Sequence, residues 1–200
     1  MVAIIDYDAG NVKSVQKAAE YLGQHAALTR DRADIMNADH VILPGVGAFG
    51  DARRKLDDYE LTGVIREVAD SGIPFLGICL GLQLLSESSE ESPGAEGLSI
   101  IPGKVKRIPD VGLKVPHIGW NSLKYPNHGR LFKDVPEGSY VYFVHSYYLE
   151  ADDPAVVTAT TEYAALIHAS VEKGNVFATQ FHPEKSSEAG LRILNNFLEI

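Results

Sequence analysis

The sequence contains little cysteine, few basic residues relative to its acidic ones, and no long apolar run. One of its 200 residues is a cysteine, which excludes an internal disulfide and any zinc site built from several cysteines. Lys and Arg total 18 against 27 Asp and Glu, and the formal net charge of −9 disfavours binding to nucleic acid or anionic lipid. No apolar run approaches the roughly 18 residues of a membrane span, and Asp6 interrupts the start before a signal peptide could develop. We therefore expect a cytoplasmic protein.

The composition, 45% hydrophobic and 22% charged, is typical of a globular protein with a sizeable core. Apolar runs alternate with helical periodicity in the first half, which predicts strands at 2–5, 41–43 and 74–78 and helices at 12–22, 61–68 and 80–85. A solvated loop is expected at 87–97, followed by strands at 104–108, 140–145, 156–160 and 176–181 and a helix at 191–198 capped by Ser186 or Ser187. We predict one α/β domain over residues 1–200, with a mostly parallel central sheet, flanking helices and a β-rich C-terminal half.

The only cysteine, Cys79, stands between a predicted strand and a predicted helix, in Gly77-Ile78-Cys79-Leu80-Gly81. A nucleophile on such a turn has a strained backbone and crowded neighbours, so small residues are needed two positions to either side, and Gly77 and Gly81 meet that need. The start of the following helix favours thiolate, the attacking species, over thiol. A buried structural cysteine between tightly packed glycines is the alternative, but the strand-to-helix context favours a nucleophile.

A cysteine nucleophile needs a base and a group that orients the base. Among the seven histidines, His182 ends an apolar strand and precedes Pro183, which favours an extended backbone. Glu184 follows two residues later, where an extended chain places side chains on the same side. We interpret His182 and Glu184 as base and orienter, the alternative being a strand-end histidine beside a solvated glutamate. Too few ligands remain for a zinc site, so we expect no metal. We also expect no cofactor.

Acyl transfer also needs hydrogen-bond donors directed at the developing oxyanion. Residues 44–47, Pro-Gly-Val-Gly, follow a predicted strand, and their glycines permit the torsions that turn amide groups toward a ligand. The segment lacks the lysine and the spacing of a phosphate-binding loop. A plain turn is the alternative, but together with the Cys79 turn the segment predicts an oxyanion hole formed by the amides of Val46, Gly47 and Leu80.

The combination of Gly-x-Cys-x-Gly with a distant His-Pro-Glu resembles the class I, or triad, glutamine amidotransferases, whose fold is flavodoxin-like. Other segments are similar to one branch of that family, the glutaminase subunits of imidazole glycerol phosphate synthase. These segments span nearly the whole chain: Asp-Tyr-Asp-Ala-Gly-Asn at 6–11, Pro-Gly-Val-Gly-Ala-Phe-Gly at 44–50, Pro-His-Ile-Gly-Trp-Asn at 116–121, Tyr-Phe-Val-His-Ser-Tyr-Tyr at 142–148 and Phe-His-Pro-Glu-Lys-Ser at 181–186. The pair Asp8-Ala9 departs from the Gly and bulkier residue expected there, which puts only the first loop in doubt.

The resemblance implies that Cys79, His182 and Glu184 hydrolyse glutamine to glutamate and ammonia. It further implies that the amino-acid end of the substrate is bound by Gln83, Ser146 and Tyr147. The ammonia would pass to a (β/α)8-barrel cyclase subunit, in a heterodimer that makes imidazole glycerol phosphate and an aminoimidazole carboxamide ribotide in histidine biosynthesis. Candidate residues for the face toward this partner are Asn11, His117, Trp120, Asn121 and Lys185.

Three other functions stay open on the sequence. The chain could serve another synthase, such as the one that makes pyridoxal phosphate, or be a catalytically silent regulatory relative, although retention of a strained Cys79 turn argues against silence. It could also be a cysteine hydrolase of the wider flavodoxin-like class, against which Gln83 and the His-Pro-Glu segment argue. The resemblance implies a glutaminase that is nearly idle until the partner binds its ligand. We expect an amide of residues 45–47 to reorient in that step.

Overall fold

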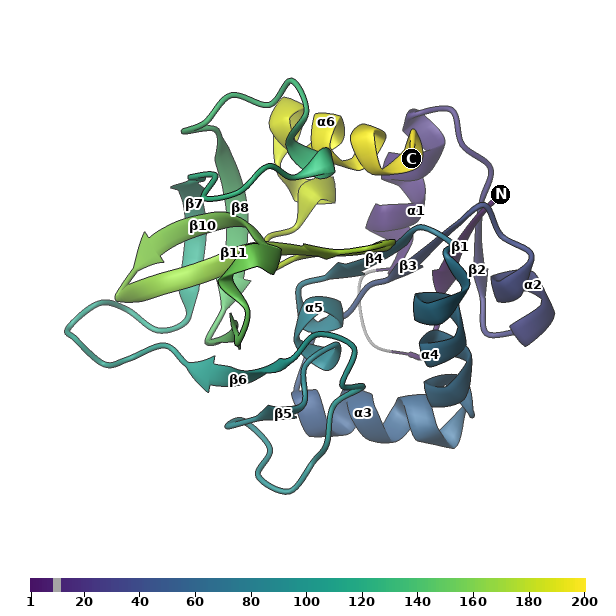
Figure 1. Cartoon of the computed structure of the whole chain (residues 1–200), viewed down its shortest axis with the longest axis horizontal. Helices are drawn as coiled ribbons and strands as arrows, with labels where there is room; N and C mark the ends of the chain where they lie inside the picture. The colour runs from purple at the N-terminus through teal and green to yellow at the C-terminus, as the bar shows by residue number, and fades with distance from the viewer. Residues whose placement is uncertain (9–11) are drawn as a thin grey trace.

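The structure, a computed structural model, describes residues 1–8 and 12–200 (Figure 1). A seven-stranded sheet forms its centre, in the order β10-β11-β12-β4-β3-β1-β2. The pairs among β12, β4, β3, β1 and β2 are parallel, whereas β10 and β11 add an antiparallel edge. Its strands are β1 (Val2–Ile5), β2 (Ala26–Thr29), β3 (His40–Leu43), β4 (Phe75–Ile78), β10 (Val157–Tyr163), β11 (Ala165–Lys173) and β12 (Val176–Thr179).

Helices cover both faces of this sheet, which explains why its inner strands are nearly continuous apolar runs (Figure 1). Along β1, Ile5 packs with the helices of one face and Ile4 with those of the other, because successive side chains point to opposite sides. The first face carries α2 (Arg32–Met36), α3 (Phe49–Asp58), α4 (Leu61–Ser71) and α5 (Leu80–Leu84). The second carries α1 (Val12–Tyr21) and α6 (Ser187–Leu198).

Two smaller sheets lie beside the central one and come from the middle of the chain, residues 88–151. One contains β5 (Ser88–Ser89), β6 (Gly103–Arg107) and β9 (Tyr147–Ala151), and the other is the antiparallel pair β7 (His117–Ser122) and β8 (Tyr140–His145). Short 3-10 turns occupy Arg130–Phe132, Pro154–Val156 and Pro183–Lys185. Among the described residues, no helix has the length and apolar character to cross a membrane.

The predicted α/β class with a mostly parallel sheet is confirmed, and several local predictions need correction. The elements β2, α2, α3, β7, β9 and β11 were not predicted, because segments of mixed polarity show little periodicity. Ser186 does occupy the N-cap position of α6, but its hydroxyl makes no capping bond. It donates to the carbonyl of His182 at 2.6 Å and accepts from the backbone N–H of Tyr142 at 2.9 Å. The hydroxyl therefore anchors the segment before the helix.

Candidate active site

Three neighbouring parallel strands bring the predicted chemical groups to one edge of the central sheet. Strands β3 and β12 both pair with β4, and Thr179 of β12 lies opposite Ile78 of β4. Each of the three strands ends just before a segment with predicted site residues: residues 44–47, Cys79, and the segment that contains His182 and Glu184. Because carboxyl ends of parallel strands meet at the same edge, pairing in the sheet unites segments that are far apart in the sequence.

Cys79 occupies the strained turn that the sequence predicted. Its backbone has φ 55° and ψ −106°, outside the regions that L-residues ordinarily adopt. The turn is close-packed, since a Cβ on Gly81 would lie 1.9 Å from the carbonyl oxygen of Leu43, and one on Gly77 would lie 3.0 Å from the backbone of Gly81. The backbone N–H of Cys79 donates to the carbonyl of Thr179 at 2.7 Å. The predicted need for small residues at both flanking positions is thus confirmed.

His182 and Glu184 form a buried pair. Nδ1 of His182 lies 2.8 Å from Oε1 of Glu184, and both side chains are almost fully buried. Within the described part of the chain, Nε2 of His182 has no hydrogen-bond partner, so it is available to exchange a proton. Burial lowers the pKa of His182, but its interactions with Cys79 and Glu184 outweigh this and raise the pKa to about 9.

The backbone of His182 is clamped to strand β8. Its N–H donates to the carbonyl of Tyr142 at 3.0 Å, while the hydroxyl of Ser186 links the carbonyl of His182 to the N–H of Tyr142. The proton-transfer group is therefore held from two sides, by its carboxylate partner and by the neighbouring strand. Precise placement of this kind limits the motion of the ring relative to the sulfur.

A cavity of about 420 Å³ opens beside the sulfur of Cys79. The residues predicted to form the oxyanion hole and to bind substrate all line it. Glu91 also lines the cavity, although the sequence placed it in a solvated loop and only its charge offered a signal. Its carboxylate accepts from the backbone N–H of Phe49 at 2.7 Å, which holds it at the first turn of α3. The complete lining is Val46, Gly47, Cys79, Leu80, Gln83, Glu91, Pro116, Val144, His145, Ser146, Tyr147 and Lys185.

Of the three backbone amides predicted to form the oxyanion hole, one already donates a hydrogen bond within the protein. The backbone N–H of Leu80 donates to the carbonyl of Gly45 at 3.3 Å. Gly47 has φ +110°, a conformation that favours glycine, and nothing lies within 4 Å of the position of a Cβ there. Gly45 instead is packed, because a Cβ would lie 2.4 Å from the hydroxyl of Tyr7. The turn is thus anchored at its first glycine and open at its second.

Gln83, on α5, lines the cavity and also makes hydrogen bonds within the protein. Its Nε2 donates to the carbonyl of Tyr147 at 2.8 Å and to Oε1 of Gln180 at 3.3 Å. These two bonds use both of its amide hydrogens, so only its oxygen, an acceptor, remains for a ligand. The structure also brings in Gln180, which the sequence analysis did not single out. Its Nε2 donates to Sγ of Cys79 at 3.7 Å.

The residues predicted for the partner face divide into different environments. Trp120 is 49% exposed, and its neighbours on the β7–β8 pair, Ile118 and Tyr140, are exposed as well. The prediction for His117 is wrong, because alternation along β7 turns that side chain inward, where it is 3% exposed and stacks on Phe143.

The other partner-face candidates also differ from one another. Asn121 is partly buried and donates to the carbonyl of Glu162 at 3.1 Å. Lys185 lines the cavity beside Cys79. Asn11 lies outside the described residues.

The departure at Asp8 has a local explanation. Asp8 adopts φ 59°, the left-handed conformation in which glycine is most at ease and aspartate is tolerated. Its carboxylate accepts from the hydroxyl of Tyr59 and pairs with Arg30 at 3.2 Å. The hydrogen bond from Tyr59 and the charge of Arg30 lower the pKa of Asp8. The side chain thus supplies contacts that a glycine would lack.

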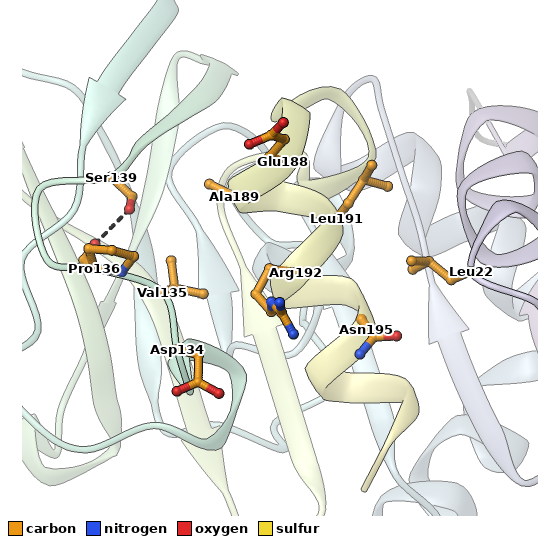
Figure 2. A pocket seen from close by; sticks show the side chains of 10 residues that line it. All are labelled: Leu22, Asp134, Val135, Pro136, Ser139, Glu188, Ala189, Leu191, Arg192 and Asn195. Atoms are coloured by element: carbon orange, nitrogen blue, oxygen red, sulfur yellow. Dashed lines mark hydrogen bonds between the residues drawn. The ribbon is translucent and has the colours of Figure 1, made fainter.

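A second hollow, of about 700 Å³, lies between α6 and residues 134–139, with Leu22, the residue after α1, at one end (Figure 2). Its lining includes neither cysteine nor histidine, and the hydroxyl of Ser139 is held by the carbonyl of Pro136 at 2.6 Å. Although it is larger than the cavity at Cys79, it contains no nucleophile paired with a base. The chemistry of the described residues therefore lies at the carboxyl edge of the sheet.

Comparison with known proteins agrees with this geometry. The family "Glutamine amidotransferase class-I" matches residues 3–200. The chain is 53% identical over 199 residues to the imidazole glycerol phosphate synthase subunit HisH of Moorella thermoacetica, covering 100% of this chain and 94% of the relative. It is 50% identical over 200 residues to the subunit of the same name from Chlorobaculum tepidum, covering both chains completely.

A solved structure titled a glutamine amidotransferase superimposes with a TM-score of 0.78 at 21% identity, covering 100% of this chain and 98% of that one. At that identity the superposition supports the fold alone. The match to the family over residues 3–200 and the full-length relatives extend the resemblance to the sequence itself. The chain therefore belongs to the class-I glutamine amidotransferase family.

Proposed function

We propose that this chain is the glutaminase subunit of an imidazole glycerol phosphate synthase and that Cys79, His182 and Glu184 carry its reaction. The observation that supports this most directly is the arrangement at one sheet edge. A strained cysteine lines a cavity of about 420 Å³, and a buried His–Glu pair follows the strand that neighbours the strand before the cysteine. The full-length similarity to HisH subunits gives the substrate, glutamine, and the setting, histidine biosynthesis.

In the first half of the reaction, the thiolate of Cys79 attacks the side-chain amide carbon of glutamine. The carbonyl electrons move onto oxygen, and the resulting tetrahedral intermediate collapses when His182 gives its proton to the leaving nitrogen. Ammonia departs and a glutamyl thioester remains on the sulfur. The raised pKa of His182, about 9, suits this role because the imidazole carries a proton at neutral pH.

In the second half, His182 removes a proton from water as the water oxygen attacks the thioester. The intermediate expels the sulfur as thiolate, which releases glutamate and regenerates the starting pair. Glu184 keeps the ring oriented through Nδ1, so that Nε2 exchanges protons on the substrate side in both halves. No further cofactor is needed for this sequence of steps.

The amide groups of Val46, Gly47 and Leu80 serve as the oxyanion hole. In the present arrangement the N–H of Leu80 is bonded to the carbonyl of Gly45, so this donor must be released before it can bind an oxyanion. Reorientation in the turn at 45–47 would do this, and its open second glycine permits such a change. We propose that binding of the partner's ligand drives this step, which would explain a glutaminase that is idle in the unliganded chain.

The free amino acid is recognised by the polar groups around the cavity. Glu91 contributes the carboxylate that an α-ammonium group requires, while Ser146 and Tyr147 line the same cavity and are candidates for the α-carboxylate. Gln83 offers an acceptor oxygen, since its amide hydrogens are used within the protein. These assignments extend the substrate set predicted from the sequence by one residue, Glu91.

The ammonia acceptor is a (β/α)8-barrel cyclase subunit, in a one-to-one pair with this chain. Its product would be imidazole glycerol phosphate together with an aminoimidazole carboxamide ribotide. The proposed docking face is the exposed apolar group on the β7–β8 pair, formed by Ile118, Trp120 and Tyr140. Lys185 and Asn121 stay candidates for contact with the partner. A net charge of −9 is consistent with the phosphorylated substrate being held by the partner instead.

Glutamate release tests this function. The chain is assayed with glutamine alone, then with the cyclase subunit, and then with the cyclase and its ribonucleotide substrate. We expect a large increase only in the complete mixture and none with Cys79→Ala. Absence of the increase with this cyclase, combined with stimulation by a pyridoxal phosphate synthase partner, would contradict the proposal. Failure with both would identify a silent relative.

A further inference from the structure

Gln180 is a fully buried amide directly beside the proposed nucleophile. It follows the last residue of β12, and its backbone N–H donates to the carbonyl of Ala169 at 2.8 Å. Its Nε2 donates to Sγ of Cys79 at 3.7 Å, within the range of a hydrogen bond to sulfur. A polar side chain at the end of an otherwise apolar strand was the available sequence signal, although nothing in the sequence connects it to Cys79.

The direction of the hydrogen bond between Gln180 and Cys79 is set by the backbone carbonyl of Tyr147, to which Gln180 is connected through Gln83. The carbonyl of Tyr147 can only accept, so the group of Gln83 that faces it at 2.8 Å is the amide nitrogen. The same nitrogen donates to Gln180 at 3.3 Å, which turns the oxygen of Gln180 toward Gln83. The nitrogen of Gln180 is left facing Cys79, so the sulfur receives a donor and not an acceptor.

Two buried histidines, His145 and His117, form a second hydrogen-bonded chain to the carbonyl of Tyr147. Nδ1 of His145 lies 2.9 Å from the oxygen of Tyr147, and Nε2 of His145 lies 3.1 Å from Nδ1 of His117. Because the carbonyl accepts, His145 carries its hydrogen on Nδ1, and His117 must donate to its Nε2. Burial lowers the pKa of His145 to about 3 and that of His117 to about 4, so both rings stay neutral.

We infer that Gln180 is a positioning residue for the nucleophile: through Gln83 and the carbonyl of Tyr147, its amide is oriented to hold the sulfur of Cys79 and to stabilise it as thiolate. The inference rests on the proposed function in taking Cys79 as the nucleophile. A donor on sulfur favours the charged form, because hydrogen bonds to ions are stronger than those to neutral groups. The chain from His117 to Cys79 is polar throughout, and Gln180 itself is not among the residues that line the cavity, so substrate need not displace it.

The test uses alkylation by iodoacetamide, in which the thiolate displaces iodide and forms a carbon–sulfur bond. Since Cys79 is the only cysteine, the rate reports on this sulfur alone and requires neither glutamine nor partner. The variant Gln180→Met keeps the size of the side chain and removes the donor. We expect alkylation at neutral pH to slow about tenfold, with its pH profile displaced to higher pH and a similar loss in kcat of the complete enzyme.

Two further variants separate positioning from folding. Gln180→Glu keeps the acceptor for Gln83 but places an acceptor at the sulfur, so we expect alkylation to slow at least as much as in Gln180→Met. Gln16→Met is the matched control, since Gln16 also donates to a backbone carbonyl, that of Ala26 at 3.0 Å, but lies on α1. Its alkylation rate should equal that of the unmodified sequence.

The inference is overturned if Gln180→Met alkylates with the original rate and pH profile, because the residue would then only fill space. It is also overturned if Gln16→Met slows alkylation as much as Gln180→Met does. A complete enzyme that releases no glutamate, together with slowed alkylation in both Gln180 variants, would instead refute the proposed function and leave the inference about the sulfur standing. The two failures are thus distinguishable.

Discussion

The two sides of the proposed active site differ in how tightly the backbone is packed. On the nucleophile side, a Cβ at Gly81 would lie 1.9 Å from a backbone oxygen, and the adjoining His182 is clamped to β8. On the oxyanion side, Gly47 has open space around it and Val46 is 38% exposed. The groups that form bonds with substrate are therefore built into the sheet, whereas the groups that stabilise charge lie on a turn with room to move.

This difference suggests where regulation can act without damaging the chemistry. Moving Cys79 would disrupt the packing between β3, β4 and α5, at a cost of several kcal/mol for overlapping backbone atoms. Reorienting an amide near Gly47 meets no such barrier in the described surroundings. A partner can thus control the reaction through the oxyanion turn while the nucleophile and its base stay in place. Substitutions on each side test this division.

The largest effect is expected from Gly81→Ala on the packed side. The added Cβ would overlap the carbonyl of Leu43, a backbone atom that cannot yield without separating α5 from β3. We expect the free energy of unfolding to fall by more than about 3 kcal/mol, or the protein not to fold. Urea denaturation measures this free energy of unfolding. Gly63→Ala, in α4 with nothing within 4 Å, is the control and should stabilise by about 0.5–1 kcal/mol. Equal stability of the two variants would contradict a packed elbow.

Glu184→Gln should lower kcat of the complete enzyme by about a thousandfold while preserving the fold. The substitution keeps the shape but removes the charge that, with Cys79, raises the pKa of His182. That pKa should therefore fall below about 9, which NMR titration of the imidazole measures. Glu188→Gln, an exposed position in the first turn of α6, is the matched control. Unchanged kcat in Glu184→Gln would remove this residue from the triad.

Gly45→Ala tests the boundary between the two sides. Its Cβ would lie 2.4 Å from the hydroxyl of Tyr7, which is itself buried and bonded to the carbonyl of Pro44 at 2.9 Å. We expect a loss of about 2 kcal/mol in unfolding free energy, part of which Tyr7→Phe should restore in the double variant. Thermal or urea denaturation of the two single variants and the double variant gives the coupling. Strict additivity would show that the first glycine is not held by Tyr7.

The smallest effect on stability is expected from Gly47→Ala. Open space surrounds the position, but φ +110° is unfavourable for alanine, so we expect a loss of about 1–2 kcal/mol in unfolding free energy. We also expect the liganded partner to stimulate glutamate release less, because the added Cβ restricts the turn that must reorient. A loss of about 1–2 kcal/mol in stability leaves the protein folded and would not by itself reduce this stimulation. The ratio of stimulated to basal rates measures it. A variant with full stimulation would place the regulated movement elsewhere in the turn.

Prediction from sequence succeeded where the chemistry depends on neighbours along the chain. The glycines around Cys79 and the two-residue spacing of His182 and Glu184 are local patterns, and the structure has both geometries. It failed for His117, because its partner-face assignment came from a motif and not from the alternation of β7. It missed Glu91 and Gln180 for a different reason, since their partners come from other segments of the chain.

The sequence by itself determined the alternation of strands and helices, the strained position of the only cysteine, and the pairing of base with orienter, because each depends on residues within a few positions. The tertiary structure decided which of these local pieces meet. The order of β3, β4 and β12 in the sheet places the turn at 45–47, Cys79 and His182 at one edge. It also places Gln180 against the sulfur. Strand order depends on contacts between distant segments, and local pattern carries no record of them.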